Sequence, residues 1–257
     1  PIHSERGRAI RHAFVASKGF TLLALDYSQI ELRLAALLSG DELLCEIFRS
    51  GRDVHQEVAA RVFHVAPEHV DAEMRRRAKA INFGILYGMG INALRQQLGT
   101  TTAETHAFYE EYFGQFKALS DYLESTKGFA RTHGYTETLF GRRRQFPEMK
   151  SSLPYVRAQA ERMAINAPIQ GTQSDIIKYA MTRVDDMLQK EKAGADAYLL
   201  LQVHDELVYE IRDDRVRALG LEIKNIMESV LKDKETHGVP ILVTMKAGPD
   251  WGSLLAI

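Results

Sequence analysis

Two aspartates lie far apart in the sequence, and each follows a run of mainly apolar residues. Asp26 ends the run at residues 22–25, and Asp205 follows the run at residues 199–203. An apolar run that stops at a carboxylate predicts a buried strand that carries an anion to the edge of a sheet. Because two such anions can hold a pair of divalent cations, the pattern favours magnesium-assisted phosphoryl chemistry.

A second group of candidate functional residues is spaced four positions apart and comprises Arg75, Lys79, Phe83 and Tyr87. On a helix this spacing places the side chains on one slowly rotating stripe. Two cations followed by two aromatic rings match a nucleoside triphosphate, with phosphates on the cations and base or sugar on a ring. The alternative is a basic surface turn that continues into a buried aromatic seam, and spacing alone does not separate the two.

Composition limits the class of protein. The 257 residues include 33 basic and 34 acidic side chains, so the net charge of -1 provides no global attraction for nucleic acid. Any site for a polyanion must therefore be local. The single cysteine, Cys45, excludes an internal disulfide and a multi-cysteine zinc site. It predicts a reducing compartment such as the cytoplasm.

The ends and the hydropathy of the chain lead to two further expectations. No apolar run approaches the length of a membrane span and the N-terminus lacks a signal-peptide pattern, so we expect no membrane partner. The sequence opens at Pro1 rather than at a methionine, which predicts a fragment or a processed product.

The first half of the chain predicts strands that lead into a helical region. Strands are expected at residues 11–17 and 21–26, joined by a turn at Lys18 and Gly19. From Gln29 the periodicity becomes helical and continues for about a hundred residues, which predicts a helical insertion. A further strand at residues 135–139 leads into a turn with a basic tip.

The second half predicts helices, a hairpin and a last strand. Helical periodicity covers residues 155–166 and 174–192, with a break expected at Pro168. A hairpin at residues 197–211 is expected to turn at His204 and Asp205, and it is followed by a helix at 215–231 and a strand at 241–246. A small antiparallel sheet split by a mostly helical insertion gives an α+β fold class.

Three segments resemble the polymerase motifs of the DNA polymerase I family (family A) and occur in that family's order. They are Asp-Tyr-Ser-Gln-Ile-Glu-Leu-Arg at residues 26–33, the stripe from Arg75 to Tyr87 with its glycines, and Val-His-Asp-Glu at residues 203–206. The resemblance implies a DNA-directed DNA polymerase that adds deoxynucleoside triphosphates to the primer 3′ end of primer–template DNA. It also implies a palm at residues 1–40 and 151–257 and fingers at 41–150.

The resemblance implies that Asp26 and Asp205 hold two magnesium ions (Mg2+), with the backbone carbonyl of Tyr27 as a further ligand. In-line displacement at an α-phosphate needs one ion to activate the primer 3′-hydroxyl and another to neutralise the leaving pyrophosphate. Glu206 is either a further metal ligand or a neighbour that tunes the site. The alternative for the aspartates is a capped turn or a solvated charge.

The same resemblance assigns nucleotide-binding roles. Arg75 and Lys79 would bind the triphosphate, and Lys79 would also protonate the leaving pyrophosphate. Phe83 would stack on the nucleotide, and Tyr87 would pack on the template side near Glu31.

Glu31, Gln29 and His204 complete the nucleotide site that the resemblance implies. Glu31 corresponds to a steric gate that leaves no room for a 2′-hydroxyl, or else it is a helix-surface carboxylate. Gln29 is expected to bind the nucleotide. His204 would contact the primer terminus, or else it is a hydrogen-bonded histidine at a hairpin turn.

A further segment resembles the part of the family that binds duplex DNA. Arg162, Asn166 and Gln170 are four apart, and such donors suit the acceptors that every correct base pair shows in the minor groove. Arg142, with its neighbours Arg143 and Arg144, would contact template phosphates or form an exposed basic turn.

Other signals are weaker. Gly88-x-Gly90-x-x-Ala93 imitates a dinucleotide-binding fingerprint but follows a predicted helix rather than a strand. His55 and His64 lack metal-ligand spacing and are expected to be structural.

The thumb, the arginine-bearing segment before the palm and any exonuclease domain of the family would lie upstream of Pro1, so a thumb-bearing segment or chain is an expected partner. The rival functions are a two-metal nuclease, which needs the same aspartates but no triphosphate stripe, and an inactive polymerase-like binding module. The presence of both aspartates together with Lys79 disfavours the inactive module.

Overall fold

The computed structural model describes residues 5–257, which form two compact units. The first unit contains the residues up to Ile30, together with 174–232 and 241–257, and the second contains 31–173 and 233–240. The first unit carries a sheet and the second is mostly helical, so the predicted α+β fold class is confirmed.

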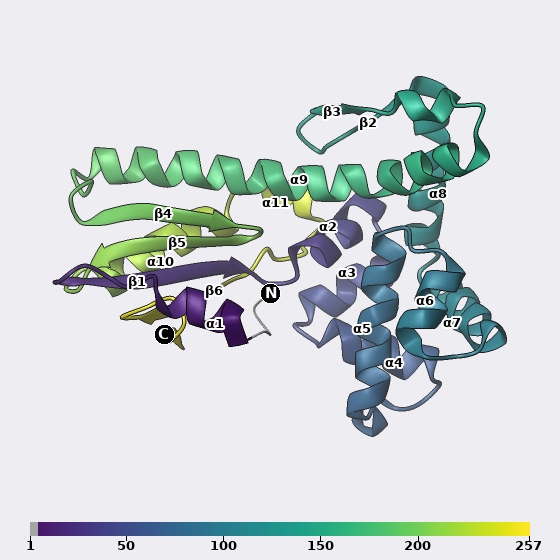
Figure 1. The fold of residues 1–257 in the computed structure, drawn as a ribbon, viewed down its shortest axis with the longest axis horizontal. Helices are drawn as coiled ribbons and strands as arrows, with labels where there is room; N and C mark the ends of the chain where they lie inside the picture. Colours follow the sequence, from purple (N-terminus) through teal and green to yellow (C-terminus); the bar gives the residue numbers. More distant parts are fainter. Residues whose placement is uncertain (1–4) are drawn as a thin grey trace. The chain divides into compact units, whose positions relative to one another are not determined.

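A five-stranded antiparallel sheet organises the first unit, in the order β4-β5-β1-β6-β7 (Figure 1). The bounds of its strands are β1 Phe20–Tyr27, β4 Ala197–Val203, β5 Glu206–Arg212, β6 Val243–Gly248 and β7 Leu255–Ala256. The strands predicted at residues 21–26 and 241–246 and the hairpin predicted at 197–211 are therefore present.

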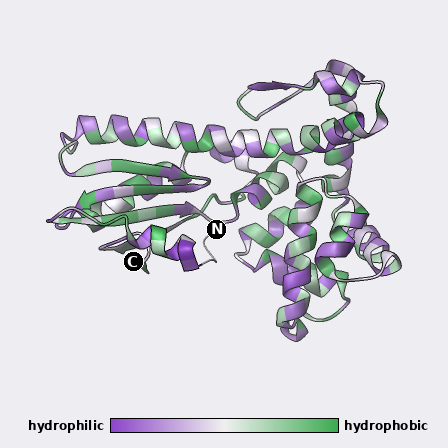
Figure 2. Ribbon diagram, in the orientation of Figure 1, coloured by the Kyte–Doolittle hydropathy of each residue, from purple (hydrophilic) through white to green (hydrophobic). Residues whose placement is uncertain are grey.

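The central strand β1 is apolar because both of its faces are covered. Its residues 22–25 are all at most 3% exposed, and Figure 2 shows hydrophobic residues along the strands of this sheet. Helix α10 (Val216–Glu228) lies against the sheet so closely that a Cβ added at Gly220 would lie 3.0 Å from Leu23 Cδ2. A strand covered on both faces has no polar side, which explains the continuous apolar run that ends at Asp26.

The prediction of a strand at residues 11–17 is wrong. Helix α1 spans Glu5–His12, with an acidic first turn and a basic last turn that suit the helix dipole. Residues 13–17 form no named strand, and their β-pairing is limited to an isolated bridge between Val15 and Asp250. The short apolar run at residues 13–16 does not reflect a buried face, because Phe14 is 42% and Val15 66% exposed.

The second unit contains the helical insertion predicted from residue 29. Its helices are α2 Ile30–Ser39, which starts at the unit boundary, α3 Glu42–Arg49, α4 Val54–Val62, α5 Ala72–Leu86, α6 Ile91–Leu98, α7 Thr102–Gln115, α8 Lys117–His133 and the short α11 Asp233–Thr236. Two 3-10 turns (Pro67–His69 and Pro147–Lys150) and a hairpin of β2 Tyr135–Glu137 with β3 Arg143–Gln145 complete it. Asp41, Asp53, Asp71 and Thr101 cap helix N-termini with their side chains, which explains where α3, α4, α5 and α7 begin.

The break predicted at Pro168 is also wrong, because α9 runs without interruption from Pro154 to Lys190. A proline inside a helix removes one hydrogen bond and costs about 3 kcal/mol. Before this site Ala160, Ala164 and Ala167 are buried against Ala130, Phe146 and Met149. After it, Ile169, Ile176 and Ile177 are buried as well. Burial of this face offsets the local cost.

None of the helices in residues 5–257 is long and apolar enough to cross a membrane.

Candidate functional site

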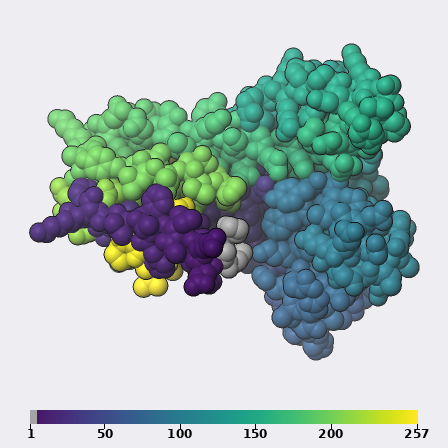
Figure 3. All heavy atoms as spheres, viewed as in Figure 1, coloured from purple at the N-terminus to yellow at the C-terminus, as the bar shows by residue number. Residues whose placement is uncertain are grey.

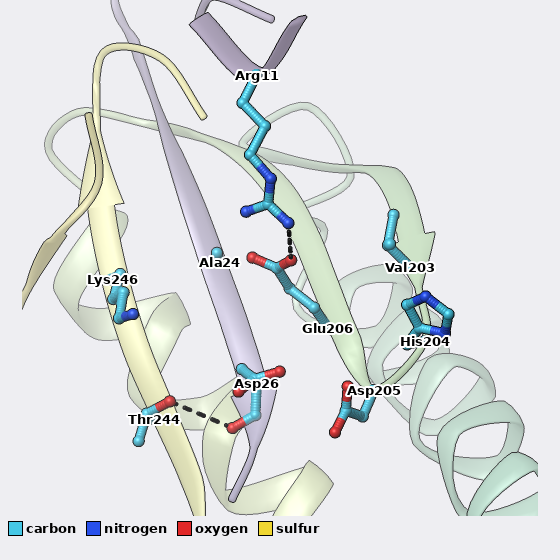
Figure 4. A pocket seen from close by; sticks show the side chains of 9 residues that line it. All are labelled: Arg11, Ala24, Asp26, Val203, His204, Asp205, Glu206, Thr244 and Lys246. Atoms are coloured by element: carbon cyan, nitrogen blue, oxygen red, sulfur yellow. Dashed lines mark hydrogen bonds and ion pairs between the residues drawn. The ribbon is translucent and has the colours of Figure 1, made fainter. Parts of the chain in front are cut away.

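The first unit brings Asp26 and Asp205 together at one end of its sheet (Figure 4). Asp26 lies on β1 opposite Glu206 on β5, and Asp205 occupies the two-residue turn between β4 and β5. The backbone N–H of Tyr27 donates to the Asp205 carbonyl at 3.2 Å. The strand ends are thereby joined, and both aspartates line one hollow of about 240 Å³.

The turn that presents Asp205 has an uncommon backbone. His204 has a φ of +54°, a left-handed conformation that costs a residue other than glycine about 1–2 kcal/mol. The side-chain amide of Gln202 donates to the His204 carbonyl at 2.8 Å and holds the turn. Gln29 also has a φ of +54°, directly before α2. Such strained residues persist only where the surrounding structure fixes them, and they are frequent at functional sites.

Burial makes both carboxyl groups weaker acids, and repulsion from neighbouring carboxylates adds to the effect at Asp26. Burial, followed by the charges of Asp205 and Glu206, raises the pKa of Asp26 from 3.8 to about 6. Burial also raises the pKa of Asp205. Lys246 and Arg11 oppose the effect at Asp26. Partly buried acids that repel each other favour a bound cation that offsets their charge.

Asp26 and Asp205 fit a magnesium site whose remaining ligands are waters and substrate phosphates. Within residues 5–257, no three His, Cys, Asp or Glu side chains converge to form a metal-binding group. Mg2+ is usually held by one or two carboxylates together with waters and substrate phosphates, so the pair of aspartates is sufficient. The Tyr27 ring is buried and its hydroxyl donates to the Met227 carbonyl at 2.9 Å, which leaves its backbone as the available ligand.

Glu206 lies beside the aspartate pair, but both of its oxygens have other partners. The indole N–H of Trp251 donates to Oε1 at 3.2 Å, and Nη2 of Arg11 lies 3.6 Å from Oε2. Figure 4 shows the Glu206 carboxylate turned toward Arg11. Arg11, Trp251, Thr244 and Lys246 were not singled out from the sequence. The one available signal was that Trp251 is the only tryptophan of the chain.

The second unit carries the predicted stripe on and just beyond α5. Arg75 and Lys79 are exposed, and Tyr87 is 40% exposed. The rings of Phe83 and Tyr87 are stacked, with centroids 6.1 Å apart and an interplanar angle of 20°. A buried aromatic seam would not leave Tyr87 so accessible, so the exposure favours the binding interpretation over the structural one.

Arg75 has a partner that was not anticipated. Its Nη2 and Nε donate to Asp53 Oδ2 at 2.7 and 3.0 Å, and Asp53 also caps α4. The pair is partly exposed, with 45% and 34% of the two side chains accessible. An exposed pair of this kind contributes at most about 1 kcal/mol, so a phosphate can replace Asp53 at low cost.

Glu31 and Tyr87 are brought together, as the resemblance implied. The Tyr87 hydroxyl donates to Glu31 Oε2 at 2.6 Å. The following Gly88 has a φ of +61°, and a Cβ there would lie 3.2 Å from the Cα of Arg162 on α9. Glycine is therefore required where the end of the stripe packs against α9.

His55, set aside as structural, lies beside the stripe. Its Nδ1 is 3.0 Å from the side-chain nitrogen of Asn82, and its ring centroid is 5.9 Å from that of Phe83. Burial lowers the pKa of His55 to about 4, so the imidazole is neutral at physiological pH. His64, in contrast, is exposed and lies 3.6 Å from Glu111.

The predicted duplex-binding residues share one face of α9, where Arg162 and Gln170 are exposed and Asn166 is half-buried. Arg142 reaches this helix by donating to the Gly171 carbonyl at 3.0 Å. Arg143 pairs with Glu137, and the Arg144 guanidinium lies 5.2 Å from the ring centroid of Phe146. The basic turn therefore has local contacts in addition to any contact with a nucleic acid.

Comparison with known proteins identifies relatives over nearly the whole chain. A family model described as DNA polymerase family A matches residues 1–253. The thermostable DNA polymerase I of Thermus filiformis is 47% identical over 251 residues, which cover 98% of this chain and 29% of that protein. DNA polymerase I of Pseudomonas aeruginosa is 46% identical, with coverage of 98% of this chain and 27% of that protein.

A solved structure also matches nearly the whole of this chain. The POL domain of Pol1 from M. smegmatis, in complex with DNA primer-template and dNTP, superimposes with a TM-score of 0.91 and 43% identity. The match covers 98% of this chain and 44% of that one. The chain thus spans less than a third of the length of these two curated relatives, 29% and 27%.

Proposed function

Because this chain belongs to DNA polymerase family A, we propose that it adds deoxynucleotides to the 3′ end of a primer under the direction of a template. The observation that carries the proposal is the convergence of Asp26 and Asp205 at one end of the sheet, in a hollow where burial and repulsion favour a cation. The exposed stripe of cations and stacked rings in the second unit supports a triphosphate as the substrate.

The palm is the sheet-bearing part of the chain, and the fingers are the helical insertion. The proposed fingers at residues 41–150 lie entirely within the second compact unit. The proposed palm at residues 1–40 and 151–257 includes every strand of the five-stranded sheet. Its residues 31–40, 151–173 and 233–240 belong to the second compact unit instead.

Two magnesium ions are the proposed cofactor, and Asp26, Asp205 and the Tyr27 carbonyl would hold them. When bound, they would activate the primer hydroxyl and neutralise the charge that develops on pyrophosphate. Arg75 exchanges its bond to Asp53 for a phosphate oxygen, and Lys79 donates a proton to the leaving group. Phe83 stacks on the nucleotide, Gln29 contacts it, and His204 contacts the primer terminus.

The test of this function uses a labelled primer–template with Mg2+, in the presence and absence of deoxynucleoside triphosphates. We expect longer products only when metal and nucleotides are both present. Shortening of the primer that needs metal but no nucleotide would favour the two-metal nuclease. Duplex binding without any change in length would favour an inactive binding module.

Replacement of Glu31 tests the proposed sugar gate. Glu31→Ala should raise the efficiency of ribonucleotide incorporation relative to deoxynucleotide by at least about tenfold, because it opens space beneath C2′. The hydrogen bond from Tyr87 holds the Glu31 carboxylate in place at 2.6 Å. Tyr87→Phe, which keeps the ring but loses that bond, should give a smaller increase. If Glu31→Ala leaves the ratio of kcat/KM for ribonucleotide to kcat/KM for deoxynucleotide unchanged, Glu31 is not the steric gate.

Primer–template DNA is the proposed polymeric substrate, contacted by Arg162, Asn166, Gln170 and Arg142. Since the matched relatives are much longer than this chain, we propose that a thumb-bearing segment or chain strengthens the grip on the duplex. Each phosphate contact adds about -0.9 to the slope of log affinity against log salt. Anisotropy titrations should give a shallower slope for this chain than for a protein that includes such a segment, and superimposable curves would contradict the idea.

A further inference from the structure

Three side chains from distant parts of the sequence form a cluster next to the aspartate pair in the first unit. They are Arg11 at the end of α1, Glu206 at the start of β5, and Trp251 beyond β6. The Arg11 guanidinium lies over the Trp251 ring at 4.0 Å from its centroid. Each of these two side chains contacts one carboxylate oxygen of Glu206. The indole N–H of Trp251 donates to Oε1 at 3.2 Å, and Nη2 of Arg11 lies 3.6 Å from Oε2.

Backbone contacts fix the position of Trp251. The N–H of Trp251 donates to the Phe14 carbonyl at 3.0 Å, and the N–H of Ala16 donates to the Pro249 carbonyl at 2.8 Å. The Phe14 ring meets the indole edge-on, with centroids 5.6 Å apart and an interplanar angle of 87°. Figure 3 shows the N-terminal and C-terminal segments adjacent on one face of this unit.

A second point of attachment lies next to the first. His12 Nδ1 is 2.8 Å from Asp250 Oδ1, which also accepts from the N–H of Gly252 at 2.9 Å. A Cβ at Gly252 would meet the His12 ring, so a larger residue there would displace the imidazole. The Ser253 hydroxyl lies 3.4 Å from the same His12 nitrogen, so the segment that carries Trp251 is attached on both sides of the indole.

The position of Glu206 makes its orientation important. It pairs with Asp26 across β1 and β5, and it directly follows Asp205. Its side chain is 15% exposed, and Figure 4 shows its carboxylate directed toward Arg11. Without the two donors, a carboxylate at this register position would be free to turn toward the aspartates.

We propose that Trp251 and Arg11 are positioning residues that hold the Glu206 carboxylate out of the cation site formed by Asp26 and Asp205. The proposal rests on the proposed function, because it assumes that this aspartate pair binds divalent cations. The charge count of the ligands sets the affinity of such sites. Release of Glu206 would add a third carboxylate, so the cations would bind more tightly and would be held in a geometry unsuited to turnover.

The test measures Mn2+ binding to the chain by electron paramagnetic resonance, without nucleotide, so that no turnover is needed. Trp251→Phe keeps a ring against Arg11 and Phe14 but removes the N–H donor. We expect it to lower the Kd for Mn2+ by about tenfold, the typical scale for partners that orient metal ligands. In a Glu206→Gln background the same substitution should have no effect on the Kd. Phe14→Leu is the matched control, because it alters packing on Trp251 without touching Glu206.

Three results would overturn the proposal. An unchanged or weakened affinity in Trp251→Phe would show that the indole does not restrain Glu206, and an effect that persists in the Glu206→Gln background would show that it acts elsewhere. Loss of Mn2+ binding in Glu206→Gln, as large as in Asp26→Asn, would make Glu206 a ligand, and this comparison holds even if Trp251→Phe does not fold. Mn2+ binding by the unsubstituted chain that is insensitive to Asp26→Asn would instead refute the metal assignment itself.

Discussion

Asp26→Asn or Asp205→Asn should abolish primer extension while sparing duplex binding. We expect a loss of at least about a thousandfold in the single-turnover rate, equivalent to about 4 kcal/mol in the activation barrier. Both carboxylates line the hollow of the first unit, and asparagine keeps their size but removes the charge that holds a cation. The proposed duplex contacts lie on α9 and on the basic turn, so they are unaffected.

The matched control is Asp214→Asn. Asp214 is an exposed carboxylate of the same unit that pairs with Arg212 at 2.6 Å. Its loss should leave both extension and primer–template anisotropy close to those of the unsubstituted chain. Near-normal turnover in either Asp26→Asn or Asp205→Asn would refute the metal assignment.

Lys79→Ala and Arg75→Ala should have different kinetic effects. Lys79→Ala should weaken nucleotide use and slow the chemical step by about a hundredfold, as expected when a general acid is lost. Arg75→Ala should mainly raise KM, because its guanidinium is already paired with Asp53 in the free protein and contributes to binding rather than to proton transfer.

The measurement is the nucleotide dependence of single-nucleotide incorporation, which gives kcat and KM separately. Arg76→Ala is the control, because Arg76 neighbours the stripe but pairs with Glu73 at 2.6 Å. Small and equal effects of Lys79→Ala and Arg75→Ala on kcat and KM would show that the stripe has a structural role rather than a nucleotide-binding one.

The parts of the site that depend on local sequence could be predicted. The apolar run before Asp26 reflects a strand covered on both faces, and the turn that carries Asp205 joins two adjacent strands. Antiparallel pairing of β1 with β5 then brings the two aspartates to the same edge. The stripe was predictable from local sequence as well, because its four-residue spacing follows the period of a helix.

The parts that depend on packing between distant segments could not be predicted. The prediction of a break at Pro168 did not take into account the buried alanines before it and the buried isoleucines after it, which keep α9 continuous. The contacts of Trp251 with Glu206 and of Arg75 with Asp53 join segments whose spacing carries no periodic signal. Hydrogen bonds of this kind follow from the fold and leave no pattern in the neighbouring residues.

Templated incorporation is the decisive test of the proposal that this chain is a DNA polymerase. A primer–template with one unpaired template base is mixed with Mg2+ and each of the four deoxynucleoside triphosphates in turn, and product length and released pyrophosphate are measured together. We expect that only the complementary nucleotide is added efficiently, that the magnesium chelator EDTA stops the reaction, and that one pyrophosphate is released per nucleotide. Addition that ignores the template base, or no addition at any concentration of Mg2+, would contradict this proposal.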